Sequence, residues 1–212
     1  YAAQGDSVME FGLRRAQGPD AGVYGARAAV IGGCCGTSNV LSGKLFDIPV
    51  KGTHAHSWIM SFPDEYTAFW TYAKYYPSAC ILLVDTYDTL KSGIPNAIRV
   101  FKEMQKQGIP LTNYGIRMDS GDLAYLSKKA RKMLDQAGFQ DAIISASNDL
   151  DEYLIENLKA QGATITSWGV GTNLITSKNC PAFGGVYKLA AIQNKQGEFL
   201  PKIKLSENTE KV

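Results

Sequence analysis

The feature that most constrains this fold is a regular alternation of short apolar runs and amphipathic segments. The apolar runs have the length of strands and lie at residues 81–84, 114–118, 142–147 and 163–170. The amphipathic segments carry apolar residues every three or four positions and lie at residues 94–107, 122–137 and 149–160. Strands that alternate with helices predict an α/β fold with a parallel sheet, either an open doubly wound sheet or a barrel.

Two further elements are predicted outside this series. Residues 63–76 have the apolar spacing of a helix, and residues 186–193 predict a last strand. Asp149 and Glu152 have the spacing of a capping box, in which two side chains bond to the backbone at the start of a helix. We therefore expect a helix that starts at Asp149 and runs to Ala160.

The composition is that of an ordinary globular protein. Of the 212 residues, 45% are hydrophobic, which is enough apolar material for a core and excludes a disordered chain. No apolar run approaches the ~20 residues that a membrane-spanning helix needs. Lysine and arginine number 22 against 20 aspartates and glutamates, so the net charge of +2 gives no support to nucleic-acid binding.

The cysteines and the chain ends bear on the compartment and on completeness. The cysteines, an adjacent pair and two distant single residues, match neither zinc-ligand spacing nor a secreted disulfide framework; they are Cys34, Cys35, Cys80 and Cys180. Residues 1–15 lack the features of a signal peptide. We expect reduced cysteines in a cytoplasmic protein. Because the chain lacks an initiator Met and stops in a polar stretch, we also expect a piece of a longer protein.

Four successive strands end in polar side chains or glycine. The residues concerned are Asp85 and Asp88, then Arg117, Asp119, Ser120 and Asp122, then Ser145, Ser147 and Asn148, and finally Gly169, Gly171 and Thr172. In parallel α/β folds, ligands bind at the carboxyl ends of the strands. The sequence therefore predicts a ligand site at this edge of the sheet.

Two of these strand ends carry charges with an assignable use. Arg117 and Asp119 lie on the same face of a strand end, where a guanidinium can bind phosphate or carboxylate and a carboxylate can accept ribose hydroxyls. The alternative is a helix N-cap beside a surface arginine, a role that suits Asp122. Asp85 and Asp88 could meet a magnesium ion or stabilise a developing cation, although Asp88 could equally solvate a loop.

The other candidate motifs are open to a structural reading. Gly171 and Thr172 resemble a phosphate cradle but, taken alone, fit an ordinary turn better. His54 and His56 could be metal ligands, acid–base groups or packing residues, and their spacing does not decide among these. Phe11 beside Arg14 could stack on a flat anionic ring, but these residues alone fit a partly buried helix with surface arginines.

Taken together, eight motifs resemble the nicotinate phosphoribosyltransferase family over essentially the whole chain. In chain order they read FGLRR, GGCCGTSN, GTHAHSW, DTYDTLKSGIPNA, RMDSGDL, SASNDLDE, GVGT and GGVYKL. The resemblance implies an irregular, TIM-like α/β barrel of the type II phosphoribosyltransferases, incomplete in this chain. It assigns residues 1–192 to the barrel core and residues 193–212 to the start of a return segment. That segment would lead to a second domain built from both chain ends.

The resemblance also implies a reaction. Nicotinate and phosphoribosyl pyrophosphate would give nicotinate mononucleotide and pyrophosphate, the first step of NAD salvage from nicotinate. ATP hydrolysis would be coupled through a phosphohistidine, magnesium would accompany the pyrophosphate, and no metal would be held by the protein alone. The enzyme would be a homodimer without nucleic-acid or membrane partners.

Site roles follow from the matching motif positions. The phosphorylated histidine corresponds to His56, and the family's motif leaves His54 without a role. Asp85 resembles the acid that faces the anomeric carbon, Asp119 the group on the ribose hydroxyls, and Arg117 a contact to the ring or phosphates. These roles suit an oxocarbenium-like transition state, which carboxylates stabilise.

The remaining assignments concern the pyridine ring and the 5-phosphate. Phe11 resembles the stacking partner of the ring, with Arg14 beside it, and Ser38 a residue near the nicotinate carboxylate. The 5-phosphate cradle corresponds to Gly171 and Thr172. The related nicotinamide-using enzymes carry an acid where this chain has Ser38, and an acid would repel a carboxylate, so Ser38 favours nicotinate. The alternatives are a nicotinamide- or quinolinate-using relative and a non-catalytic truncated phosphate-binding barrel.

Overall fold

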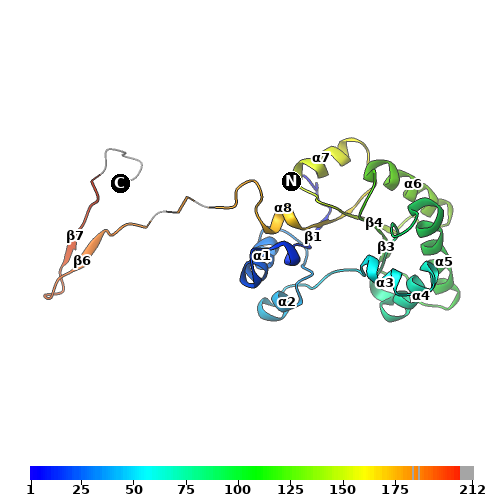
Figure 1. Cartoon of the computed structure of the whole chain (residues 1–212), viewed down its shortest axis with the longest axis horizontal. Coiled ribbons are helices and arrows are strands. Elements are labelled where there is room, and N and C mark those ends of the chain that lie inside the picture. The colour runs from blue at the N-terminus through cyan, green and yellow to red at the C-terminus, as the bar shows by residue number, and fades with distance from the viewer. Residues whose placement is uncertain (183, 186, 206–212) are drawn as a thin grey trace. The chain divides into compact units, whose positions relative to one another are not determined.

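A computed structural model of the chain describes residues 1–182, 184–185 and 187–205. It divides into two compact units, Tyr1–Asn179 and Cys180–Val212 (Figure 1). Among the described residues, no helix has the length and apolar character that crossing a membrane requires.

The first unit is built on a five-stranded parallel sheet with the order β1-β5-β4-β3-β2 (Figure 1). The strands are β1 (Ser7–Glu10), β2 (Cys80–Leu83), β3 (Tyr114–Met118), β4 (Ile143–Ser147) and β5 (Ser167–Val170). The register pairs Ile116 with Ile144 and Ala146 with Trp168, which aligns the carboxyl ends of the strands. The predicted parallel α/β fold is confirmed.

Helices cover one face of this sheet. Before β2 lie α1 (Pro19–Ile31), α2 (Val40–Phe46), α3 (His56–Met60) and α4 (Glu65–Tyr75). The later helices are α5 (Ile94–Lys106), α6 (Leu123–Gln136), α7 (Glu152–Ala160) and the single-turn α8 (Thr172–Ile175). Short helical turns occupy Leu13–Arg15 and Pro77–Ala79, and a π-helical turn occupies Thr89–Gly93.

Alternate strand residues form the core beneath these helices. Leu82, Ile116 and Trp168 are fully buried, because side chains two apart on a strand point to the same face. Phe101 of α5 packs edge-on against Tyr114, with ring centroids 5.0 Å apart. The amphipathic pattern that predicted α5 therefore corresponds to its contact with the sheet.

The opposite face of the sheet mixes serines and a glycine with apolar side chains such as Met9 and Ile81. It carries Ser145 and Ser167, and it borders a cavity of about 490 Å³. Gly115 is required here, since a Cβ at this position would lie 2.0 Å from the carbonyl oxygen of Ile143. In the described residues no ladder joins β1 to β2, so closure into a barrel stays a prediction.

Two local predictions were wrong. The N-cap of α7 is Asp151, whose carboxylate accepts from the backbone N–H of Leu154 at 2.8 Å, whereas Asp149 lies in the preceding turn with a φ of 44°. The strand expected at residues 186–193 is shorter: β6 (Ala191–Gln193) pairs antiparallel with β7 (Phe199–Pro201) in the second unit. Residue 186 lies outside the described residues.

The first unit ends at Asn179, and the end of the barrel core at residue 192, which the resemblance implies, stays a prediction. A polar, Gly-containing hairpin between β6 and β7 follows, in which Asn194 caps the turn by accepting from the N–H of Glu198. The role of residues 193–212 as the start of a second domain stays a prediction.

Candidate active site

A pocket of about 330 Å³ lies at the carboxyl ends of the strands, where the sequence predicted a site. Its lining includes seven residues predicted from the sequence: Phe11, Arg14, His56, Arg117, Asp119, Gly171 and Thr172. Arg15, Ala55, Ser147, Asn148, Asp149 and Gly169 complete it. This size falls in the range of small-molecule sites.

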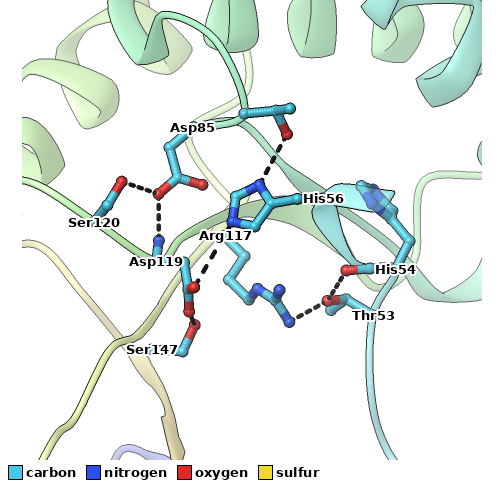
Figure 2. Close-up of polar contacts among 9 residues, drawn as sticks. Thr53, His54, His56, Asp85, Arg117, Asp119, Ser120 and Ser147 are labelled. Atoms are coloured by element: carbon cyan, nitrogen blue, oxygen red, sulfur yellow. Dashed lines mark hydrogen bonds and ion pairs between the residues drawn. The ribbon is translucent and has the colours of Figure 1, made fainter. Parts of the chain in front are cut away.

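His56 begins α3, and each of its ring nitrogens faces an oxygen of a neighbouring side chain (Figure 2). Its Nδ1 lies 3.0 Å from the hydroxyl of Thr86, and its Nε2 lies 3.7 Å from Oδ2 of Asp119. The side chains of His56 and Asp119 are each 39% exposed, so both groups remain open to a ligand. Thr86 lies directly after Asp85, and no spacing pattern in the sequence identified it.

Asp119 follows β3 and connects three strand ends (Figure 2). Its Oδ1 accepts a hydrogen bond from the Ser147 hydroxyl at the end of β4. Its backbone N–H donates to Oδ2 of Asp85 at 2.7 Å, after the end of β2. The carboxylate is therefore fixed in direction, with Oδ2 turned toward His56.

Asp85 lies behind the pocket lining, where it holds the loop that carries Asp119. Besides the Asp119 N–H, its Oδ2 accepts from the hydroxyl of Ser120 at 2.6 Å. Its Oδ1 is buried and has no hydrogen-bond partner among the described residues. A buried, unpaired carboxylate oxygen is costly, which marks Oδ1 as an acceptor available to a ligand.

Arg117 points from β3 into the same region. Its Nη1 donates to the Thr53 hydroxyl at 2.6 Å, while its Nε is buried without a partner in the described part of the chain. Burial lowers the pKa of Arg117, and the carboxylates of Asp119 and Asp85 oppose that effect. The guanidinium thus keeps an unused donor for an anionic ligand.

His54 has the packing role that the sequence left open. Its ring lies edge-on to Tyr72 with centroids 4.6 Å apart, and its Nε2 accepts from the backbone N–H of Leu83 at 3.3 Å. Burial, followed by the charges of Arg117 and His56, lowers its pKa to about 4. His54 is therefore neutral and anchors the 53–56 segment to the edge of β2.

Phe11 forms the opposite wall of the pocket. Its ring lies against Gly169, where a Cβ would come within 2.5 Å of the ring. Glycine is therefore needed at position 169 for close approach of the ring. Phe11 is partly exposed, so its ring can stack on a flat ligand.

The same wall continues through the loop after β5. Gly171 precedes α8, and Arg15 donates to the hydroxyl of Thr172 at 3.2 Å. Arg14 and Arg15 are both exposed at the pocket. This wall therefore combines glycine backbone with two guanidinium groups, a combination that suits a phosphate.

The turn after β4 adds Asn148, one of the predicted strand-end residues, and Asp149, which the sequence predicted as a helix cap. Asn148 and Asp149 have φ angles of 121° and 44°, a region that residues with side chains seldom occupy. The Asn173 amide holds this turn by donating to the carbonyl oxygens of Asp149 and Leu150. Strained backbone of this kind is concentrated at functional sites.

Three other candidates lie elsewhere. Ser38 is exposed beyond the end of β1 and does not line the pocket, although its N–H donates to the Glu10 carbonyl. Asp88 caps the π-helical turn by accepting from the N–H groups of Leu90 and Lys91. Asp122 caps α6, as its alternative reading predicted.

Within the described ranges, no three His, Cys, Asp or Glu side chains are grouped closely enough to hold a metal ion. The unpaired Oδ1 of Asp85 and the carboxylate of Asp119 nevertheless supply two hard oxygen donors. Such a set fits Mg²⁺ that arrives with phosphate ligands and keeps several waters.

Comparison with known proteins gives a consistent answer. The nicotinate phosphoribosyltransferase (NAPRTase) family model matches residues 7–204. A nicotinate phosphoribosyltransferase of Bacillus subtilis is 61% identical over 98% of this chain, and one of Dictyostelium discoideum is 41% identical over 97%. These alignments cover 42% and 41% of the relatives, so the chain spans less than half of their length.

Solved structures agree in fold. Human nicotinic acid phosphoribosyltransferase aligns with a TM-score of 0.68 and 28% identity, covering 80% of this chain and 44% of that one. A nicotinate-nucleotide pyrophosphorylase from Pyrococcus furiosus aligns with a TM-score of 0.69 and 26% identity, covering 83% and 44%. With the family match over most of its length, the chain belongs to the nicotinate phosphoribosyltransferase family.

Proposed function

We propose that this chain carries the catalytic site of a nicotinate phosphoribosyltransferase. The ring nitrogen of nicotinate would attack the anomeric carbon of phosphoribosyl pyrophosphate, whose bond to the pyrophosphate oxygen breaks. The products are nicotinate mononucleotide and pyrophosphate. One observation carries the proposal: Phe11, Arg117, Asp119 and His56 line a single pocket at the carboxyl ends of the strands.

The pocket offers separate groups to the two ends of the product. The Phe11 ring offers a stacking surface for the pyridine, and the unused Nε of Arg117 offers a donor to its carboxylate or to a phosphate. Gly171 and Thr172, beside Arg15, would receive the 5-phosphate. The ring and the phosphate would then both lie on the wall opposite Asp119.

Asp119 and Asp85 would act on the ribose. Positive charge develops on the ribose as the pyrophosphate leaves, and a preoriented carboxylate lowers the energy of that state. Asp119 is preoriented by Ser147 and by Asp85, so it loses little freedom when it accepts the ribose hydroxyls. Asp85 would stabilise the charge through its unpaired Oδ1.

We infer that His56 is the phosphorylated residue when ATP hydrolysis is coupled to the transfer. When Nδ1 donates its proton to the Thr86 hydroxyl, Nε2 keeps its lone pair and can accept a phosphoryl group. Asp119 faces this nitrogen at 3.7 Å, so ribose binding by Asp119 and the state of His56 would influence each other.

Bound Mg²⁺ would neutralise the departing pyrophosphate. The oxygen donors on this chain are Asp85 Oδ1 and the Asp119 carboxylate, while the pyrophosphate itself would provide other ligands.

Three wider features belong to the same proposal: an irregular barrel, a homodimer and a cytoplasmic location. The barrel is supported by the path of residues 37–54. Thr37 bridges to Glu10 at the edge of the sheet and also to Val50, and His54 accepts from Leu83 on the opposite edge strand, β2. This segment thus runs between the two edges of the sheet.

Quinolinate is the second candidate for the pyridine substrate, because the fold alone does not select among pyridine carboxylates. The 61% identity to a relative named for nicotinate favours nicotinate, as does the histidine in GTHAHSW.

A competition assay tests the proposal. The full-length protein is incubated with phosphoribosyl pyrophosphate, Mg²⁺, ATP and equal amounts of nicotinate, nicotinamide and quinolinate, and the products are separated. Nicotinate mononucleotide, formed without carbon dioxide release, is expected from nicotinate alone. Nicotinamide mononucleotide, or release of carbon dioxide from quinolinate, would overturn the substrate assignment, and absence of product would overturn the activity.

The role of His56 has its own test. His56→Ala should abolish the stimulation by ATP and leave a weak ATP-independent rate, because only the phosphorylated residue is lost. His54→Gln serves as the comparison, since His54 is buried away from the pocket and should retain ATP stimulation. Unchanged stimulation in His56→Ala would remove His56 from its role.

A further inference from the structure

Glu10 is a fully buried carboxylate that the proposed reaction does not use. It ends β1, directly before Phe11, and its exposed fraction is 0%. In the part of the chain that the structure describes, no lysine, arginine or histidine lies within salt-bridge distance of it. Burying a charge without a cation is expensive, so its hydrogen bonds must compensate for the lost hydration.

Those hydrogen bonds tie together two segments beside the pocket. Oε1 accepts from the backbone N–H of Gly12, and Oε2 accepts from the hydroxyl of Thr37 at 2.5 Å. Gly12 can approach because it lacks a side chain: a Cβ there would lie 2.9 Å from Oε1 and 2.4 Å from the Ile175 Cβ. The carboxylate thus links the residues on either side of Phe11 in the chain.

The second segment is fixed through Thr37. The Thr37 hydroxyl donates to Glu10 and also accepts from the N–H of Asn39 at 2.9 Å. Asn39 in turn caps α2, accepting from Ser42. The Glu10 backbone completes the connection by accepting from the N–H of Ser38 at 3.0 Å.

We propose that Glu10 is a positioning residue for pyridine recognition: by joining Gly12 to Thr37, it fixes the backbone that carries the Phe11 ring. The inference rests on the proposed function, because it assigns the pyridine to the Phe11 wall. In this arrangement Glu10 contacts no ligand and acts through the two segments that it joins, at Gly12 and at Thr37. Glutamine at this position keeps the shape but offers only one acceptor oxygen to two donors.

The test is a split between the two substrates in the full-length protein. Glu10→Gln should raise KM for nicotinate about tenfold, the effect expected from losing one charge-assisted hydrogen bond. KM for phosphoribosyl pyrophosphate should rise by less than twofold, because its ribose contacts follow β3 and its 5-phosphate cradle follows β5, with only Arg15 on the segment that Glu10 holds. Thr37→Val should act in the same direction, and Thr37→Ser, which restores the hydroxyl, should recover the wild-type KM.

Glu65→Gln is a matched control. Glu65 is 4% exposed and accepts from the Ser92 hydroxyl at 2.5 Å and the Asn96 amide at 3.0 Å, away from the pocket lining. The same chemical change there should lower the melting temperature and leave both KM values unchanged.

The outcomes separate the two hypotheses. If the wild type makes nicotinate mononucleotide and Glu10→Gln lowers only the apparent kcat, as loss of folded protein would, the positioning role is wrong and the proposed function stands. If Glu10→Gln does not fold, Thr37→Val decides, and an unchanged KM for nicotinate in that variant overturns the inference. If the wild type does not use nicotinate, the proposed function fails and the positioning role fails with it.

Discussion

The pocket has two walls made in different ways. On the wall formed by the ends of β2, β3 and β4, side chains hold one another, from Asp85 through Asp119 to Ser147 and His56 (Figure 2). On the wall formed by the ends of β1 and β5, backbone shape dominates, and the Phe11 ring lies on a glycine. The first wall would bind a ligand through its charged side chains. The second depends on the close approach of the Phe11 ring to the backbone of Gly169.

This difference explains why the first wall is the easier to predict. A carboxylate directly after an apolar strand has few structural uses, so Asp85 and Asp119 stand out as candidates by type and position, whereas the roles expected of them come from the family resemblance. A glycine after a strand fits an ordinary turn equally well, and the sequence does not say what it lies against.

The largest effect should come from removing charge from the first wall. Asp119→Asn keeps the shape of the side chain but removes the negative charge that would face the ribose, so kcat/KM should fall by about 10² to 10³. Steady-state kinetics of the full-length protein measure this loss.

Asp122→Asn is the control for that variant. Asp122 is a nearby exposed carboxylate that caps α6 through the N–H of Tyr125, and asparagine caps helices equally well. Its activity and stability should stay at the wild-type level. A loss below tenfold in Asp119→Asn would mean that the charge of this wall does not drive the reaction.

The next effect concerns the pH dependence of the free energy of unfolding, and it comes from His54. Burial lowers the pKa of His54 from 6.5 to about 4, so the folded protein resists protonation there while the unfolded chain accepts a proton. The contribution of the neutral His54 ring to the free energy of unfolding is complete above pH 6.5 and is lost as the pH falls from 6.5 toward 4. It amounts to about 3 kcal/mol at most.

Urea unfolding across this pH range provides the measurement. The free energy of unfolding of the wild type should decline between pH 6.5 and 4 by about 3 kcal/mol more than that of His54→Gln, which has no titratable group. Parallel curves for the two proteins would show that position 54 is not a buried neutral imidazole.

The smallest effect should come from the second wall, and it should be selective. In Gly169→Ala the new Cβ would lie 2.5 Å from the Phe11 ring, so the ring must move. KM for nicotinate should rise about tenfold, a cost of the size found for misplaced contacts, with KM for phosphoribosyl pyrophosphate unchanged.

Gly52→Ala is the matched control, since a Cβ there would meet nothing within 4 Å. It should leave both KM values unchanged. Equal increases in both KM values for Gly169→Ala would mean that the Phe11 ring and the 5-phosphate contacts are not separate in function.

The sequence predicted the sheet more completely than the site. Apolar runs and helical spacing identified β2 to β5 and α4 to α7, because burial on one face imposes a period that can be counted. The N-cap of α7 was assigned to Asp149 instead of Asp151, since both are aspartates before the same helix and only the backbone conformation distinguishes them.

Site residues that act through contact or burial were not predictable. Thr53 and Thr86 are ordinary threonines until folding brings them to Arg117 and His56. Glu10 precedes a surface-like FGLRR motif and gives no sign of being fully buried. Ser147 was noted at a strand end, but its bond to Asp119 depends on the pairing of β4 with β3.

A crystal structure of the full-length protein with nicotinate mononucleotide bound would test the central claim most directly. The account predicts the pyridine ring stacked on Phe11, the ribose hydroxyls on Asp119 and the phosphate beside Gly171 and Thr172. A mononucleotide bound elsewhere, or bound in this pocket with its ribose away from Asp119, would contradict it.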